Sequence, residues 1–104
     1  MRKSLTAVFF KENERFVGFS ISGHAGYGTE GNDIVCAAIT SAVELTCNTI
    51  TEFFSVSAKV DVFENEVALR LEESNDFAEK LLESLYEHIG YIAKEHSRIK
   101  LEIR

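Results

Sequence analysis

Two kinds of hydrophobic periodicity alternate along the chain. Residues 4–12 are rich in β-branched and aromatic side chains and predict a strand. Residues 15–23 alternate strictly, which is typical of a half-buried strand that pairs with the first as a hairpin across Asn13-Glu14. The alternation places Val17, Phe19 and Ile21 on one face and Phe16, Gly18, Ser20 and Ser22 on the other.

From Ile34 to about Phe54 the pattern becomes helical. The first three turns carry so few polar residues that we expect this helix to be buried on most sides. Residues 56–64 and 66–72 alternate again around Asn65 and predict a second hairpin.

A second, amphipathic helix is predicted from Asp76 to about Glu95. Its apolar stripe comprises Phe77, Leu81, Leu85, His88 and Ile92. In a final strand, Ile99, Leu101 and Ile103 alternate with charged residues. The order ββαββαβ predicts an α+β fold in which both helices pack on an antiparallel or mixed sheet.

The chain has 104 residues, without proline or repeats, and we expect one domain over residues 1–104. A chain of this size buries only about two-thirds of its extended surface, so assembly into an oligomer would help its stability.

The net charge of −6 comes from 17 acidic and 11 basic residues, and the basic residues are scattered. Nucleic-acid-binding proteins instead cluster lysine and arginine, so we expect no direct nucleic-acid contact. The apolar run after Met1-Arg2-Lys3 ends at Lys11-Glu12, which argues against a signal peptide. No stretch approaches the ~18 apolar residues of a membrane span. We therefore expect a cytoplasmic protein whose two cysteines are free thiols.

The residues between the second strand and the first helix hold the candidate chemistry. Four of the six glycines lie here, namely Gly23, Gly26, Gly28 and Gly31, and they predict a mobile loop. Asp33 is a good N-cap residue, which makes Cys36 the third residue of the helix. Unpaired N–H groups and the helix dipole favour a thiolate there, and the thiolate is the nucleophilic form of cysteine.

His24 ends the second strand and is the candidate partner of Cys36. If that strand end lies beside the helix start, the histidine is a base within reach of the thiol. Backbone N–H groups at and after Cys36 would then be available to bind an oxyanion. The alternatives are a cysteine that is simply a small buried hydrophobe and a histidine that only caps the strand.

The remaining cysteine and histidines predict no second site. Cys36 and Cys47 lie ~16 Å apart along a continuous helix, too far for a disulfide or a shared zinc ion. We expect Cys47 in the core or an interface, His88 packed on the apolar stripe and His96 at a helix end. No cofactor and no metal is expected.

The segment Gly26-Tyr27-Gly28-Thr29-Glu30-Gly31 also matches the G-x-G-x-x-G pattern of dinucleotide-binding loops. The preceding hairpin and the acids Glu30 and Asp33, placed where a pyrophosphate would sit, argue against that function. Nucleotide binding is kept only as a third alternative.

Gly23-His24-Ala25, followed at this spacing by Gly31-Asn32-Asp33-Ile34-Val35-Cys36-Ala37-Ala38, resembles the signature of the ribosomal-processing cysteine protease (Prp) family. The resemblance extends over essentially the whole chain. It implies a homodimeric bacterial protease that removes the N-terminal extension of a large-subunit ribosomal protein. It also implies that His24 and Cys36 are catalytic and that Gly23 and Asp33 support the site.

One position departs from the family pattern. The family commonly has serine four residues after the cysteine, where this chain has Thr40. The hydroxyl is kept, so we expect little effect. Asp33 either orients His24 or caps the helix, and we favour the cap. The leading hypothesis is peptide hydrolysis by a Cys36–His24 dyad through an acyl-enzyme; the alternative is a non-catalytic ribosome-associated protein that binds through the same cleft.

Overall fold

The computed structural model describes residues 4–23 and 33–104. Their element order is the expected ββαββαβ. The elements are β1 (Leu5–Glu12), β2 (Arg15–Gly23), α1 (Ile34–Asn48) continued by the π-helical turn η1 (Thr49–Phe53), β3 (Ala58–Phe63), β4 (Glu66–Leu71), α2 (Asp76–Glu95) and β5 (Ile99–Ile103). Each predicted strand and helix is present, with ends that differ by two residues or fewer.

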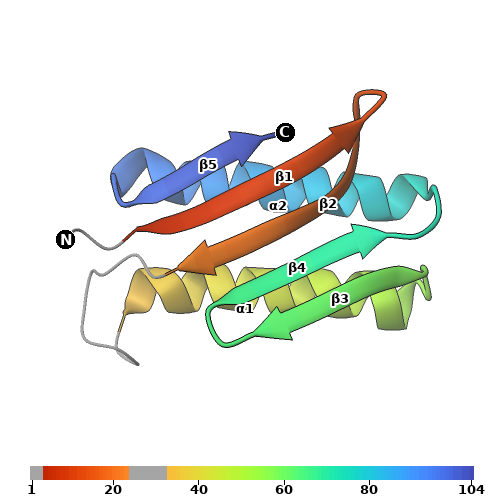
Figure 1. Cartoon of the computed structure of the whole chain (residues 1–104), viewed down its shortest axis with the longest axis horizontal. Helices are drawn as coiled ribbons and strands as arrows, with labels where there is room; N and C mark the ends of the chain where they lie inside the picture. Colours follow the sequence, from red (N-terminus) through yellow and green to blue (C-terminus); the bar gives the residue numbers. More distant parts are fainter. Residues whose placement is uncertain (1–3, 24–32) are drawn as a thin grey trace.

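The strands form one mixed sheet in the order β3-β4-β2-β1-β5. β5 runs parallel to β1, and the other neighbours are antiparallel. Both helices cover the same face of this sheet (Figure 1). The turn between β1 and β2 has positive φ at both Asn13 (54°) and Glu14 (65°), as a two-residue type I′ hairpin turn requires. Both predicted hairpins are therefore confirmed.

A bulge in β2 changes which side chains reach the core. Phe10 pairs with Gly18 while Lys11 pairs with Phe16, so Val17 is an extra residue. Phe16 consequently lies on the same face as Phe19 and packs its ring 5.6 Å from that of Tyr86. The strict alternation expected from the sequence placed Phe16 on the opposite face, and this prediction is wrong because the bulge shifts the phase by one residue.

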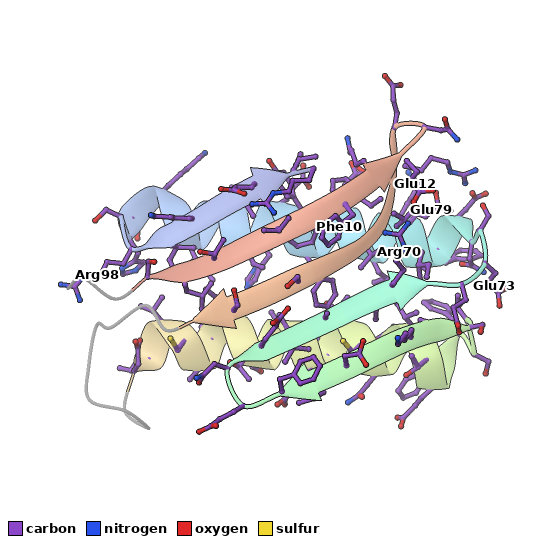
Figure 2. All side chains as sticks on the ribbon, viewed as in Figure 1. Phe10, Glu12, Arg70, Glu73, Glu79 and Arg98 are labelled. Atoms are coloured by element: carbon purple, nitrogen blue, oxygen red, sulfur yellow. The ribbon has the colours of Figure 1, made fainter. Side chains whose placement is uncertain are left out.

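No helix or strand of the described residues covers the sheet face away from the helices (Figure 1). At the end that carries the β1–β2 turn, Arg70 of β4 forms an ion pair with Glu12 of β1 (Figure 2). Towards the other end, Ser20 of β2 donates a hydrogen bond of 2.8 Å to Glu66 of β4. Cross-strand pairs of this kind help to set the register of the sheet.

Only one side of α1 is buried, along Ile39, Val43 and Cys47. Ile34 is 81% exposed and Leu45 is 70% exposed. The expectation that this helix is buried on most sides is therefore wrong. A helix in a two-layer fold has an outer side that nothing else in the described chain covers, however apolar its sequence.

The buried stripe of α2 is also displaced from the predicted one. It comprises Ala78, Glu79, Leu82, Leu85 and Ile89. His88 is exposed, so the prediction of a packed histidine is wrong. Phe77 is exposed as well and stacks on Phe54, with 5.5 Å between the ring centroids. The apolar stripe predicted for α2 was wrong at this position, because Phe77 is apolar but does not belong to the core.

The helical segment Ile34–Phe53 is long and apolar enough, by length and composition, to cross a membrane. This corrects the expectation that no such stretch exists. The core helix of a globular protein passes the same test, and here Ile39, Val43 and Ile50 pack into the core under the sheet. The core therefore accounts for one side of the segment, while Ile34 and Leu45 remain exposed on the other side.

Candidate active site

Cys36 lies in the first turn of α1, as the sequence predicts. The Asp33 carboxylate caps the helix by accepting hydrogen bonds from the N–H groups of Val35 (3.0 Å) and Cys36 (3.1 Å). The next N–H group, of Ala37, donates to the Asp33 carbonyl at 3.0 Å. The cap therefore fixes the backbone that carries the thiol, and the predicted capping role of Asp33 is confirmed.

The same cap occupies the backbone donors expected to bind an oxyanion. Since the N–H groups of Cys36 and Ala37 both have partners, neither is available in this structure. The expectation that N–H groups at and after Cys36 could bind an oxyanion stays a prediction, because it requires these groups to change partners. Before the Cys36 N–H could donate a hydrogen bond to an oxyanion, its hydrogen bond to the Asp33 carboxylate would have to break.

Gly23 ends β2 close to the start of α1. Its φ of +85° is unfavourable for residues with a side chain, and an added Cβ would lie 2.4 Å from the Ser4 carbonyl oxygen. Its N–H donates to the Asn65 carbonyl at 3.0 Å, which ties the strand end to the β3–β4 turn. His24 follows directly in the sequence but lies outside the described residues, together with Gly26, Gly28 and Gly31.

Cys36, Gly23 and Thr40 line one cavity of about 280 Å³, which we call the Cys36 cavity. Its other lining residues are Leu5, Ile21, Ile39, Val43, Glu44, Val62, Phe63, Glu64, Asn65, Glu66 and Val67. Three of the predicted site residues are thereby brought together, and Asp33 is held beside them as the helix cap. The cavity lies between the sheet, α1 and the β3–β4 turn.

The β3–β4 turn and the residues beside it were not predicted to contribute to the site. Residues 62–67 all line the Cys36 cavity, although they lie 26 or more positions after the cysteine. One local feature of the sequence could have indicated a binding surface here. Val62 and Phe63 are apolar and lie next to a turn, where exposed apolar residues are unusual. No pattern within one sequence, however, says which distant element such residues face.

Cys47 has a different environment from Cys36. Its side chain is buried, whereas that of Cys36 is partly exposed, and both thiols are free. Burial raises the pKa of the Cys47 thiol to about 11, with a further contribution from the negative charge of Glu44. The expectation that Cys47 belongs to the core and forms no disulfide with Cys36 is confirmed. At neutral pH Cys47 is a protonated thiol and a poor nucleophile.

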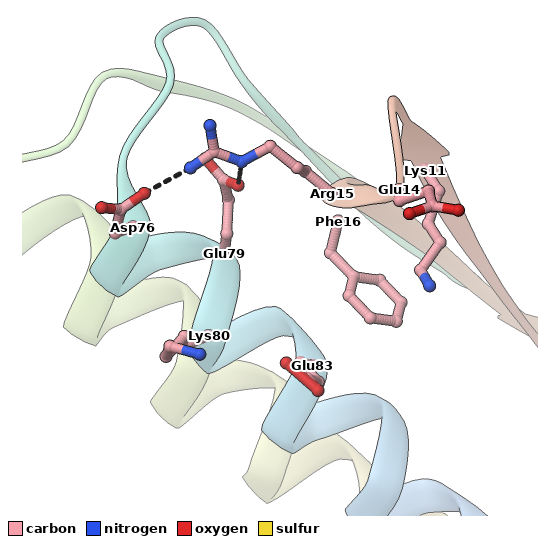
Figure 3. Close-up of a pocket in the computed structure, with 8 residues that line it drawn as sticks. All are labelled: Lys11, Glu14, Arg15, Phe16, Asp76, Glu79, Lys80 and Glu83. Atoms are coloured by element: carbon pink, nitrogen blue, oxygen red, sulfur yellow. Dashed lines mark hydrogen bonds and ion pairs between the residues drawn. The ribbon is translucent and has the colours of Figure 1, made fainter.

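A second cavity, of about 290 Å³, lies by the β1–β2 turn and the start of α2, at the opposite end of the sheet from the start of α1 (Figures 1 and 3). Here Arg15 bridges Asp76 and Glu79 (Figure 3). The hydrogen bond that Arg15 donates to Glu79, together with the negative charge of that carboxylate, raises the pKa of the Arg15 guanidinium above its usual range. This network ties the β1–β2 hairpin to α2.

Within residues 4–23 and 33–104, no group of three or more histidine, cysteine and acidic side chains could hold a metal ion.

A family model described as cysteine protease Prp matches residues 5–99, so the protein is a cysteine protease. The chain belongs to the Prp peptidase family. No curated protein sequence matches it.

Solved structures share the fold at low sequence identity. A ribosomal processing protease Prp from S. aureus, in complex with a covalently linked product peptide, superimposes with a TM-score of 0.90 at 23% identity, covering 96% of this chain and 99% of that one. The same protease with a substrate peptide gives 0.84 at 22% identity, with the same coverage. SMU.848 from Streptococcus mutans gives 0.75 at 22% identity, covering 97% and 96%. These structures have the same two helices on a five-stranded mixed sheet.

Proposed function

We propose that this protein is an endopeptidase that removes the N-terminal extension of a bacterial large-subunit ribosomal protein, with Cys36 as nucleophile and His24 as base. The observation that carries the proposal is the family match over residues 5–99, which includes a cysteine held in a first helical turn beside a cavity. The S. aureus relative is described as a ribosomal processing protease and was solved with a substrate peptide, which supports a peptide substrate here.

The proposed reaction has two stages. His24 accepts the Cys36 proton, and the thiolate attacks the scissile carbonyl to form a tetrahedral intermediate. As the intermediate collapses, His24 protonates the leaving amine and an acyl-enzyme remains. A water molecule, deprotonated by His24, then hydrolyses the thioester and frees the thiol.

The supporting residues have distinct proposed tasks. Asp33 holds the start of α1, and thereby the backbone of Cys36, through its two hydrogen bonds. Gly23 delivers the chain from β2 to His24 through its positive φ. Thr40 lies one turn after Cys36 and presents a hydroxyl at the same cavity. The loop with Gly26, Gly28 and Gly31 is proposed to move when the substrate enters.

The direct test is to incubate the purified protein with a ribosomal-protein precursor that carries its extension. We expect one cleavage by the wild-type protein, and none by the Cys36→Ala and His24→Ala variants within the same time. Cys47→Ala is the matched control and should retain cleavage. Full cleavage by Cys36→Ala would end the proposal.

Thiol alkylation distinguishes the protease from the alternative of a non-catalytic ribosome-associated binding protein. Iodoacetamide near neutral pH should modify Cys36 much faster than Cys47, because an activated thiol is partly ionised and Cys47 is not. Site-specific rates from peptide mass spectrometry provide the measurement. Equal and slow modification of both thiols would favour the binding protein.

We further propose a cytoplasmic homodimer that binds neither nucleic acid nor membrane. The exposed apolar residues Ile34 and Leu45 on the outer side of α1 support association, because a monomer leaves them in water. The scattered basic residues and the net charge of −6 support the absence of nucleic-acid binding.

A further inference from the structure

The Cys36 cavity is too small to hold a length of peptide. Its volume of about 280 Å³ lies below the ~300–1,000 Å³ of pockets that enclose a drug-sized ligand. A peptide whose scissile bond lies at Cys36 must therefore continue over the surface beside the cavity. Strand β3 offers such a surface, because its last residues, Val62 and Phe63, line the cavity and the strand forms one edge of the sheet. It runs towards the end of the molecule where α1 begins (Figure 1).

The main chain of β3 has hydrogen-bonding groups on its outer side. The Ser57 carbonyl accepts a hydrogen bond of 2.9 Å from the Glu72 N–H. Because hydrogen-bonded residues alternate along an antiparallel pair, the odd-numbered residues of β3 also bond to β4. The N–H and C=O groups of Ala58, Val60 and Val62 therefore point away from β4, and no other strand of the described residues pairs with them.

The same edge exposes apolar side chains. Val62 lies opposite Val67, and Val60 lies opposite Leu69, which belongs to the core. Val60 and Val62 thus extend the core-facing side of the sheet beyond β4, yet they are 37% and 71% exposed. The strand contains no proline and its pairing with β4 has no bulge, which are two of the devices that commonly protect an edge. An edge of this kind is suited to pairing with an added strand.

We propose that the outer edge of β3 binds the extended main chain of the substrate as a sixth strand and so leads the scissile bond to Cys36. This inference rests on the proposed function, since it states how the same site holds its peptide. Main-chain hydrogen bonds to Val60 and Val62 supply affinity, and the two side chains pack against alternate side chains of the peptide. The opposite edge strand, β5, contributes no residue to the described lining of the cavity.

Amide hydrogen exchange tests this pairing residue by residue. The probe is a synthetic peptide that spans the cleaved junction of a ribosomal-protein precursor, added to the Cys36→Ala variant so that the peptide stays intact. We expect the amides of Val60 and Val62 to exchange fast without peptide and about tenfold or more slowly at saturating peptide, measured by NMR.

The outward amides of β5 provide the matched control. Arg104 donates its N–H to the Phe9 carbonyl at 2.8 Å and accepts from the Lys11 N–H at 3.0 Å, so the even-numbered residues of β5 pair with β1. The amides of Leu101 and Ile103 consequently point away from the sheet. Their exchange should be the same with and without peptide.

Backbone N-methylation of the peptide tests the pairing from the substrate side. With one amide methylated at a time, kcat/KM of the wild-type protein should fall by about 3- to 10-fold at every second position on one side of the scissile bond, because only alternate amides face β3.

Val60→Pro removes one outward donor and leaves the hydrogen bonds to β4 intact. It should raise KM for the peptide by about 3- to 10-fold and keep kcat within about twofold, as expected for a contact made equally by substrate and transition state. Ile103→Pro makes the same change on β5 and should leave both constants unchanged.

The outcomes separate the two proposals. If the wild-type protein cleaves neither the peptide nor the intact precursor, the proposed function fails. If it cleaves both, but bound peptide leaves the exchange of Val60 and Val62 unchanged and methylation shows no two-residue alternation, the protease stands and the edge-binding inference is overturned. Protection of these amides without peptide that disappears on dilution would assign the edge to a second copy of the chain, which overturns the inference as well.

Discussion

At the scale of single residues, Gly23 gives the clearest prediction. Gly23→Ala places a Cβ against the Ser4 carbonyl oxygen at a φ of +85°, so we expect the free energy of unfolding to fall by about 1–3 kcal/mol. Urea denaturation measures this loss. Gly90→Ala in α2 is the control, because its Cβ would meet only Leu101 Cδ2 at 3.6 Å. That variant should be as stable as wild type or more stable, since alanine favours helix by about 1 kcal/mol.

Cys47 predicts a pH dependence of stability. Its pKa rises from 9.0 to about 11 on folding, so as the pH passes 9 the unfolded chain loses this proton first. Unfolding therefore becomes more favourable between about pH 9 and 11, and the stabilising contribution present below pH 9 is lost. We expect the wild-type protein to lose about 1–2 kcal/mol more than Cys47→Ala over this interval. Parallel losses in the two proteins would contradict the assignment.

The sequence correctly predicts where a residue lies in the fold when that depends only on its neighbours in the chain. Asp33 has the side chain of a helix cap, and the place of Cys36 in the first turn follows from it by counting. Phe16 and His88 were misplaced for a non-local reason. The bulge at Val17 depends on how two strands pair, and the burial of α2 depends on where the sheet meets it.

At the scale of elements, Glu79 connects a hairpin to a helix. Its buried carboxylate accepts hydrogen bonds from Arg15 Nε of β2 and from the Asn75 N–H at the start of α2. Glu79→Gln removes the charge that Arg15 needs, so we expect the free energy of unfolding to fall by about 1–3 kcal/mol in thermal or urea denaturation.

Asp76→Asn is the matched control for this prediction. Asp76 also pairs with Arg15, but its side chain is 82% exposed. The free energy of unfolding should therefore fall by less than about 0.5 kcal/mol in this variant. Equal losses in the two variants would show that burial of Glu79 contributes nothing.

The helices and strands were largely predictable from the sequence, but which of them lie next to one another in the fold was not. Alternation and helical periodicity identify each strand and helix because local burial produces them. The parallel pairing of β1 with β5 and the approach of the β3–β4 turn to Cys36 join segments far apart in the sequence. Such contacts depend on the packed molecule as a whole, and the sequence of either segment alone carries no record of them.

At the scale of the whole molecule, the outer side of α1 predicts the state of association. If this side forms the proposed dimer interface, Leu45→Gln should raise the dimer dissociation constant by about tenfold or more, because it replaces an apolar contact by a polar one. Sedimentation velocity over a concentration series gives the constant. Ile103→Gln, at the outer strand β5, is the control and should leave it unchanged.

The position of β5 has a consequence for the lifetime of the protein. β1 is an interior strand only because residues 99–103 run beside it. A peptidase that trims this short segment leaves β1 as a long edge strand with unpaired N–H and C=O groups. Exposed edges of this kind pair with other chains, so limited digestion at the β5 end should drive the clipped protein into aggregates rather than into a smaller soluble fragment.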